Sequence, residues 1–242
     1  MDLITFVPDT PEANIALDEL LLVKAETGEV GESLRFWSGE DYCVVLGRAC
    51  KVGAEVNVDD CRRDNIKILR RASGGGTVLQ GKGCFNYSLI LSYDREPSYK
   101  EVTSSYNIIL TGISNALSTP DRILTVLPLC DIACNERKVS GNAQCRKRKY
   151  FLHHGTFLMD FDIDKIGIYL KHPPKEPEYR GGRSHEGFLM NLHEENKTIE
   201  NTIKGIYLDD TSGVWEPAAS DLERLSDLIQ GKYSQDKWNL AF

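Results

Sequence analysis

Three consecutive glycines, preceded by two arginines and a serine, form the segment of this chain best suited to hold an anion. The segment reads Arg70-Arg71-Ala72-Ser73-Gly74-Gly75-Gly76-Thr77. Glycine lets the backbone approach a ligand closely, and successive free N–H groups in a turn can surround an anion. The arginines could add charge-assisted hydrogen bonds to phosphate or carboxylate. We expect an anion-binding loop, with a plain hairpin turn as the alternative; the Gly-Lys-Ser/Thr ending of a Walker A loop is absent.

A lysine followed by small residues forms a second candidate segment, Arg137-Lys138-Val139-Ser140-Gly141-Asn142-Ala143-Gln144. A strand lysine can place positive charge where negative charge develops during acyl or nucleotidyl transfer. An exposed lysine without a chemical role is the alternative for a single residue of this type.

The third candidate segment is His153-His154-Gly155-Thr156, which precedes an apolar stretch. Successive side chains of a strand point to opposite faces, so the two histidines do not form a metal-binding pair. Cys130 and Cys134 also lack the two-pair spacing of a zinc site. We therefore expect no metal site built from protein ligands alone.

The composition limits the class of protein. The chain has 242 residues, of which 41% are hydrophobic and 27% charged, and a net charge of −7 that argues against a general nucleic-acid binder. Its seven cysteines are odd in number and scattered, which indicates reduced thiols. It has neither a run long enough to span a membrane nor a signal-like N-terminus, so we expect a cytoplasmic protein without a membrane partner. Basic residues gather at 146–149, which suits an acidic partner or a solvated surface.

The elements that must position these segments are mixed helices and strands. Thr10-Pro11-Glu12 has the layout of a helix start. Apolar spacing predicts further helices at 99–117, 164–170 and 220–229, and a loop at 172–183. Alternation predicts strands at 34–36, 42–46, 66–69, 87–91, 123–127, 131–134 and 157–161. Because these elements do not alternate strictly, we expect an α+β domain with a mixed sheet flanked by helices.

Together, in this order, the three candidate segments resemble the superfamily of lipoate–protein ligases and octanoyltransferases, which also includes biotin–protein ligases. The lipoate ligases are the most similar branch: residues 70–77 look like their RRxSGGG motif, 138–144 like K-[VI]-S-G-[SN]-A, and 153–156 like HHGT. Weaker matches lie at 14–19, 44–48, 83–88, 183–184 and 188–192. The resemblance runs from about residue 13 to 192.

This resemblance implies a class II biotin/lipoyl-ligase-like catalytic domain with an acyl pocket beneath the glycine loop. It implies that ATP, assisted by Mg²⁺, converts lipoate to lipoyl-AMP. The acyl group then passes to a lysine of an E2 lipoyl domain or a glycine-cleavage H protein. We expect one catalytic domain over residues 1–242, because the fifty residues after Leu192 are too few for the C-terminal accessory domain of many lipoate ligases. That accessory part could be a separate subunit.

The resemblance also assigns residues. Lys138 would be catalytic, stabilising charge on the phosphate and the carbonyl oxygen. The residues expected to bind ATP or the acyl-adenylate are Arg70, Ser73, Gly74, Gly75, Gly76, Thr77, Asn86, Ser140, Gly141, Ala143, His154, Gly155 and Thr156.

Two other functions stay open. Octanoyltransferases of the superfamily pass the acyl group from a carrier thioester through a cysteine, but the two positions where their cysteine lies hold Phe151 and Val126 here. Cys130 lies close to the second position, and Cys84 is expected to have a packing role. A non-catalytic lipoyl-binding or carrier-docking protein is the second alternative. The biotin ligases carry a Gly-Arg-Gly-Arg-type loop where this chain has Gly74-Gly75-Gly76. This difference makes a biotin ligase the weaker match.

Overall fold

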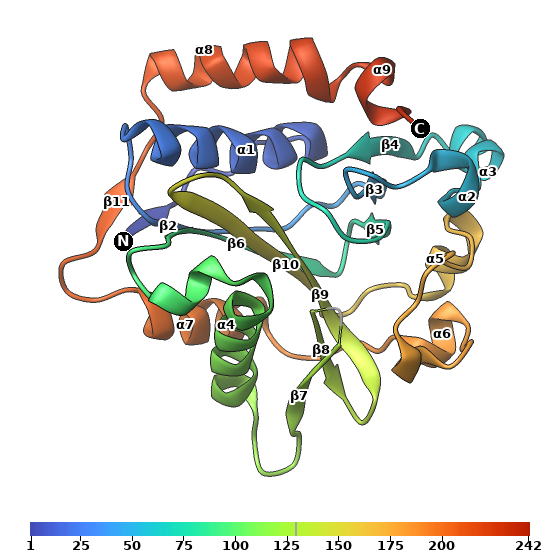
Figure 1. Cartoon of the computed structure of the whole chain (residues 1–242). Coiled ribbons are helices and arrows are strands. Elements are labelled where there is room, and N and C mark those ends of the chain that lie inside the picture. The colour runs from blue at the N-terminus through green and yellow to red at the C-terminus, as the bar shows by residue number, and fades with distance from the viewer. Residues whose placement is uncertain (129) are drawn as a thin grey trace.

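A mixed eight-stranded sheet forms the centre of the computed structural model, which describes residues 1–128 and 130–242 (Figure 1). The strand order is β11-β1-β2-β6-β10-β9-β8-β7; β11, β1 and β2 run parallel, and the other neighbours are antiparallel. The strands are β1 (Asp2–Ile4), β2 (Ser33–Trp37), β6 (Cys84–Ser92), β7 (Leu124–Leu127), β8 (Asp131–Cys134), β9 (Arg137–Arg146), β10 (Tyr150–Leu158) and β11 (Gly213–Trp215). This arrangement is the α+β fold with a mixed sheet that the sequence predicts.

A second sheet of three strands carries the glycine segment. Its order is β4-β3-β5, with β3 (Cys43–Leu46) parallel to β4 (Lys67–Arg70) and antiparallel to β5 (Val78–Gln80). The glycine loop, residues 71–77, connects β4 to β5. The small sheet lies beside α1, above the large sheet in Figure 1, so the glycine loop faces the middle strands.

Helices cover both faces of the large sheet (Figure 1). On one face α1 (Pro11–Thr27) packs beneath α8 (Ala219–Leu228), and on the other face lie α4 (Val102–Leu117) and α7 (Asn196–Tyr207). The remaining short helices are α2 (Val52–Glu55), α3 (Val58–Arg63), α5 (Asp164–Tyr169), α6 (His185–Phe188) and α9 (Asp236–Asn239). Among the described residues, no helix is both long and apolar enough to cross a membrane.

Helix α1 begins where the sequence predicts. The Thr10 side chain accepts a hydrogen bond from the Ala13 N–H, and Pro11 occupies the first turn. Its buried residues point at β6 and β10, and they pack with residues of the small sheet and of α8 into one core. This core sets the distance between the small sheet and the large sheet, and therefore the distance of the glycine loop from the large sheet.

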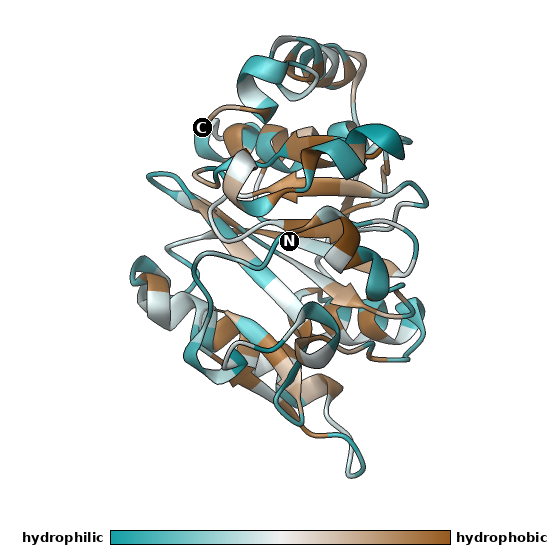
Figure 2. Ribbon diagram, turned by 90° about the vertical axis from the view of Figure 1, so that its right-hand side faces the viewer, coloured by the Kyte–Doolittle hydropathy of each residue, from teal (hydrophilic) through white to brown (hydrophobic). Residues whose placement is uncertain are grey.

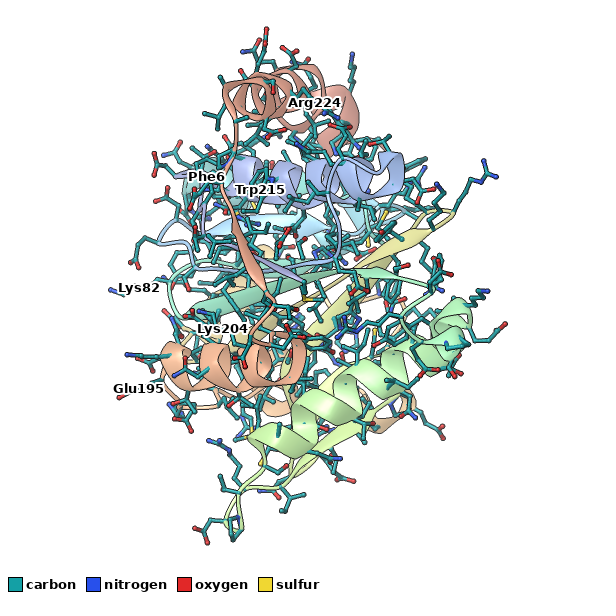
Figure 3. All side chains as sticks on the ribbon, turned by 90° about the vertical axis from the view of Figure 1, so that its left-hand side faces the viewer. Phe6, Lys82, Glu195, Lys204, Trp215 and Arg224 are labelled. Carbon is teal, nitrogen blue, oxygen red and sulfur yellow. The ribbon has the colours of Figure 1, made fainter. Side chains whose placement is uncertain are left out.

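A second core fills the opposite face, where alternate residues of β6 and β10 meet α4 and α7. Figure 2 shows the hydrophobic colour concentrated on the strands and inner helix surfaces, with hydrophilic turns outside. Figure 3 shows the β11 edge, where Trp215 and Arg224 lie near α1 and Lys204 lies on α7. At this edge Lys24 of α1 is buried, forms an ion pair with Asp221 of α8, and lies over the Trp215 ring.

Three predicted elements differ from the structure. The strand expected at 157–161 is longer and begins earlier in the chain: it is β10 (Tyr150–Leu158). Its pairing with β6 and β9 already includes the polar residues that precede the apolar stretch. The helix expected at 99–117 divides into a 3₁₀ turn, Pro97–Lys100, and α4. The helix expected at 220–229 is α8 (Ala219–Leu228), in which Leu225 packs into the core while Leu222 is 44% exposed.

Candidate functional site

A cavity of about 1160 Å³ lies between the large sheet and the glycine loop. Two rows of side chains on neighbouring strands form its floor. The strand register places Asp131, Gly141, Thr156, Asn86 and Trp37 side by side across β8, β9, β10, β6 and β2. The next row, two residues further along, holds Ala143, His154 and Ser88. All eight residues line the cavity.

The floor gives the cavity a direction. Four strand spacings separate β8 from β2, and at about 4.8 Å each they span roughly 19 Å. Lys138 lies at the β8–β9 end, and Trp37 lies at the β2 end. A long, thin ligand can therefore lie across the strands with one end beside Lys138.

Arg71 holds the glycine loop in shape. Its guanidinium donates hydrogen bonds to the carbonyl oxygens of Gly74 (2.6 Å) and Gly76 (2.8 Å) and to Ser73 Oγ (3.0 Å). A further hydrogen bond reaches the Val45 carbonyl of β3 at 3.1 Å. The carbonyls of Gly74 and Gly76 are thus turned toward the arginine, while Gly74, Gly75 and Gly76 are exposed at the cavity. This geometry leaves the loop N–H groups for an anionic ligand.

Gly47 lets the loop approach the small sheet. A Cβ atom at Gly47 would lie 1.9 Å from the Gly75 carbonyl oxygen, so a side chain there would collide with the loop backbone. The Cys50 thiol donates to the same oxygen at 3.3 Å, and the Arg48 N–H donates to the Ser73 carbonyl at 2.9 Å. The weak sequence match at 44–48 therefore marks the support of the glycine loop.

Arg70 lies outside the cavity, and the structure differs here from the expected ligand contact. Its guanidinium donates to five carbonyl oxygens, those of Gly47, Arg48, Cys50, Trp238 and Ala241. The side chain is fully buried and ties the 47–50 turn to the segment after α9. These five hydrogen bonds hold the guanidinium within the fold, so we assign Arg70 to the scaffold and the loop-shaping role to Arg71.

His154 links the glycine loop to α1. Its Nε2 lies 2.7 Å from Ser73 Oγ, and its Nδ1 lies 3.1 Å from Asp18 Oδ2. Arg35 donates to the other Asp18 oxygen at 2.9 Å, and Ser88 donates to Oδ2 at 2.8 Å. Burial alone would raise the pKa of Asp18, but these hydrogen bonds and the Arg35 charge hold that pKa below its ordinary value.

Ser73, His154 and Asp18 have the order of a nucleophile, base and orienting acid. Ser73, however, is 1% exposed, lies behind the cavity wall, and accepts a hydrogen bond from Arg71. Its hydroxyl proton is then free for His154 Nε2. The chain of hydrogen bonds therefore fixes the glycine loop on the sheet rather than presenting a nucleophile.

Lys138 is held at the cavity by a buried carboxylate. Its Nζ lies 2.7 Å from Asp131 Oδ1, and Tyr179 donates to Asp131 Oδ2 at 2.7 Å. The Asp131 side chain is 6% exposed, and that of Lys138 is 23% exposed. A localised positive charge thus faces the cavity, where it can stabilise a phosphate or a developing oxyanion.

His153 points away from the cavity, as expected for the neighbour of His154 in a strand. Its Nε2 lies 3.1 Å from the Tyr87 hydroxyl, and its Nδ1 lies 3.2 Å from the Gln144 amide. Tyr87 in turn donates to Asn142 Oδ1 at 2.7 Å. Burial lowers the pKa of His153 to about 3, so the imidazole is neutral and forms part of the core.

Gly155 makes room for Asn142. A Cβ atom at Gly155 would lie 1.9 Å from Asn142 Oδ1. The Asn142 amide donates to the Cys130 carbonyl at 2.9 Å, and the Cys130 thiol donates back to the Asn142 carbonyl, also at 2.9 Å. The glycine of the HHGT segment therefore supports the chain around Cys130.

At the cavity end near β2, polar side chains form the floor and the Trp37 ring closes the end. Gln80 donates to Thr156 Oγ1 at 3.0 Å, and Thr156 donates to Asn86 Oδ1 at 2.6 Å. Trp37 is 7% exposed and separates the main cavity from a second one of about 280 Å³ on the surface.

Cys130 lies on the cavity wall. Burial, followed by the charge of Asp131, raises the pKa of this thiol to about 11, so the thiol rather than the thiolate is present at neutral pH. Cys84 is 2% exposed within the core, and burial raises its pKa to about 12. Cys84 thus has the packing role expected for it.

The structure brings most predicted site residues together. Those that line the cavity are Gly74, Gly75, Gly76, Thr77, Asn86, Lys138, Gly141, Ala143, His154, Gly155 and Thr156. Ser73 supports the loop from behind, and Ser140 is 1% exposed and faces away from the cavity. Sequence reasoning missed Asp18, Trp37, Tyr106 and Asp131, which also line it. For Asp18 a signal existed, since it is an acid within the apolar stripe of a predicted helix.

Comparison with known proteins identifies the family. The family model "Lipoyl protein ligase A/B catalytic domain" matches residues 10–205. A relative over nearly the whole chain is the octanoyltransferase LipM of Brevibacillus brevis, 24% identical over 96% of this chain and 95% of that protein.

Two solved structures share the fold. One is the bi-partite lipoate protein ligase of Thermoplasma acidophilum, described together with its E2 lipoyl domain (TM-score 0.81, 22% identity, 99% of this chain and 95% of that one). The other is a lipoate-protein ligase A bound with ATP (TM-score 0.79, 22% identity, 99% and 98%). The family model covers most of the chain, including all three motifs that shape the cavity, and the chain belongs to the lipoyl protein ligase A/B catalytic-domain family of lipoate ligases and octanoyltransferases.

Proposed function

We propose that this chain is an ATP-dependent lipoate–protein ligase. It activates lipoate as lipoyl-AMP and transfers the lipoyl group to a lysine of a carrier protein, an E2 lipoyl domain or a glycine-cleavage H protein. The observation that carries this proposal is a cavity of about 1160 Å³ with Lys138 and the glycine loop at one end. Pockets for one drug-sized ligand usually measure about 300–1,000 Å³, so this volume suits an acyl chain and a nucleotide together.

The cavity floor suggests how the ligand lies. The acyl chain would cross the floor toward Trp37, with its carboxyl end beside Lys138. The phosphate would meet the exposed N–H groups of Gly74, Gly75 and Gly76. Both anionic parts would then lie within reach of the Lys138 ammonium, which Asp131 holds in place.

The transfer step places these groups in sequence. The ε-amine of the carrier lysine attacks the acyl carbonyl carbon, a C–N bond forms, and the bond from that carbon to the AMP oxygen breaks. Negative charge appears first on the carbonyl oxygen and then on the departing phosphate. Lys138 stabilises both charges, and the amine loses one proton to solvent or to a base in the site.

Mg²⁺ would enter with the nucleotide. Among residues 1–128 and 130–242, no three His, Cys, Asp or Glu side chains converge on one point. Mg²⁺ usually keeps several waters and needs only one or two carboxylates beside substrate phosphates. Glu55 is a carboxylate on the cavity wall that could supply such a contact.

The bi-partite relative motivates a proposal about partners. That ligase is described with its E2 lipoyl domain, and its matched chain is covered over 95% of its length by this fold. We propose that this chain also acts on a lipoyl domain and that a separate accessory subunit takes part in the reaction.

A second candidate is a cysteine-dependent transferase that uses an octanoyl or lipoyl thioester. The match to LipM over nearly the full chain and the place of Cys130 on the cavity wall favour it. Two observations argue against Cys130 as the nucleophile. Its pKa is raised to about 11, so little thiolate is present at neutral pH, and its thiol donates a hydrogen bond to the Asn142 carbonyl.

Mass spectrometry of an apo lipoyl domain separates the two candidates. The purified chain is incubated with lipoate, ATP and Mg²⁺, with the domain as acceptor. A mass increase of one lipoyl group that requires ATP supports the ligase. Transfer from an octanoyl carrier protein without ATP, lost in Cys130→Ser, would overturn the ligase in favour of the transferase.

A further inference from the structure

We infer that Tyr179 is a positioning residue for Lys138. It acts through Asp131, because the Tyr179 hydroxyl and the Lys138 ammonium bind the two oxygens of the same carboxylate. This inference rests on the proposed function only for the reaction in which Lys138 acts. Its geometry stands on three side chains from three separate parts of the chain, the 178–180 turn, β8 and β9.

The Asp131 carboxylate has one partner on each oxygen. Lys138 Nζ lies 2.7 Å from Oδ1, and the Tyr179 hydroxyl donates to Oδ2 at 2.7 Å. The carboxylate is 6% exposed, so water gives it little help. Burial, followed by the charge of Asp131, raises the pKa of Tyr179, which therefore keeps its proton and acts as a donor.

The segment that carries Tyr179 is fixed to the same strand as Lys138. The Met190 N–H donates to the Lys138 carbonyl at 3.0 Å, and Lys138 forms a parallel bridge with Leu189. The Tyr179 ring lies 5.1 Å from the Phe188 ring, and the Arg180 guanidinium lies 4.8 Å above Phe188. The residues at 173–175 of this segment line the cavity. Tyr179 thus joins a cavity wall to the charged pair.

The hydroxyl matters most when Lys138 leaves Asp131. A lysine that turns toward a phosphate or a carbonyl oxygen, or that loses its proton, leaves a buried carboxylate without its cation. A hydrogen bond to a carboxylate is stronger when no cation shares the charge, so Tyr179 stabilises this state more than the paired one. It therefore lowers the cost of releasing Lys138 to the reaction.

The other charged and titratable groups around this pair come from several elements. They are Cys130 next to β8, Tyr106 of α4, Arg71 of the glycine loop, and Arg180 and Arg183 of the segment that carries Tyr179. The two arginines face Tyr179, and neither makes a hydrogen bond to Asp131. Tyr179 is therefore the partner through which this segment acts on Asp131.

Tyr179→Phe tests the inference, because it removes the hydroxyl and keeps the ring against Phe188. Tyr169→Phe is the matched control: that tyrosine is also packed, and it donates to Asp64 at 3.1 Å outside the cavity. The first readout is the rate at which an amine reagent labels Lys138 at one fixed pH, followed by mass spectrometry. We expect Tyr179→Phe to lower this rate about threefold or more, because an Asp131 carboxylate without the tyrosine hydroxyl holds Lys138 more tightly, and we expect Tyr169→Phe to leave it unchanged.

The second readout is the reaction, whichever acyl donor supports it. We expect Tyr179→Phe to lower kcat about tenfold with little change in KM for the carrier domain, and we expect no further loss when it is added to Asp131→Asn. An unchanged rate of Lys138 labelling in folded Tyr179→Phe would overturn the inference. So would an equal effect of Tyr179→Phe with and without Asp131. The labelling experiment needs no turnover, so a chain inactive in both acyl-transfer assays would count against the proposed function and leave this test intact.

Discussion

Lys138 is the residue whose charge the proposed chemistry cannot replace. Its ammonium faces the cavity, where the proposed function places the junction of acyl chain and phosphate, and Asp131 fixes its position. We expect Lys138→Ala to lower kcat/KM for lipoyl transfer at least about a hundredfold, which corresponds to about 2.7 kcal/mol of transition-state stabilisation. Transfer assays with Lys147→Ala as the exposed control measure this, and a folded, fully active Lys138→Ala protein would contradict the role.

His153 makes the fold sensitive to acid. Its pKa in the folded state is about 3, below the ordinary 6.5, because the buried imidazole resists protonation. The unfolded chain therefore binds more protons between these values, and stability is lost as pH falls from 6.5 toward 3. One such group lowers the free energy of unfolding by up to about 1.4 kcal/mol per pH unit.

Denaturant unfolding at several pH values checks this. The slope of unfolding free energy against pH between about 6 and 4 should be steeper in the native chain than in His153→Gln. Equal slopes would show that His153 does not titrate on unfolding.

At the scale of elements, the glycine loop depends on Gly47, which directly follows β3 of the small sheet. Gly47→Ala would bring a methyl group to 1.9 Å from the Gly75 carbonyl oxygen, so the loop backbone must move. We expect at least a tenfold rise in KM for ATP with a modest loss of thermal stability. Gly53→Ala meets open space and should change neither quantity; the same KM for both variants would argue against this support of the loop.

Much of this arrangement was predictable from the sequence, because the motifs are local. Thr10-Pro11 marked the start of α1, and the placement of two histidines on opposite strand faces followed from strand geometry alone. The scaffold role of Arg70 was not predictable. Its five carbonyl partners come from residues 47–50 and 238–241, and the sequence does not say that these segments meet. Asp131 and Tyr179 escaped notice for the same reason, since their importance lies in a contact across 48 residues.

At the scale of the whole molecule, Trp37 sets the far limit of the cavity. Among the residues that the structure describes, it is the one that lines both the main cavity and the surface cavity of about 280 Å³. We expect Trp37→Leu to connect the two, so that acyl groups longer than lipoate or octanoate are transferred. Competition between acyl donors of increasing length, read by mass spectrometry of the carrier, measures this. Trp215→Leu on β11 alters no cavity residue, and an unchanged length preference in Trp37→Leu would place the limit elsewhere.

The cavity floor runs across the strands rather than along them. A substrate that lies on this floor therefore crosses successive hydrogen-bonded strands, which are spaced about 4.8 Å apart. The length of floor open to an acyl chain therefore depends on the number of strands between Lys138 and Trp37 and on the side chain that closes the far end.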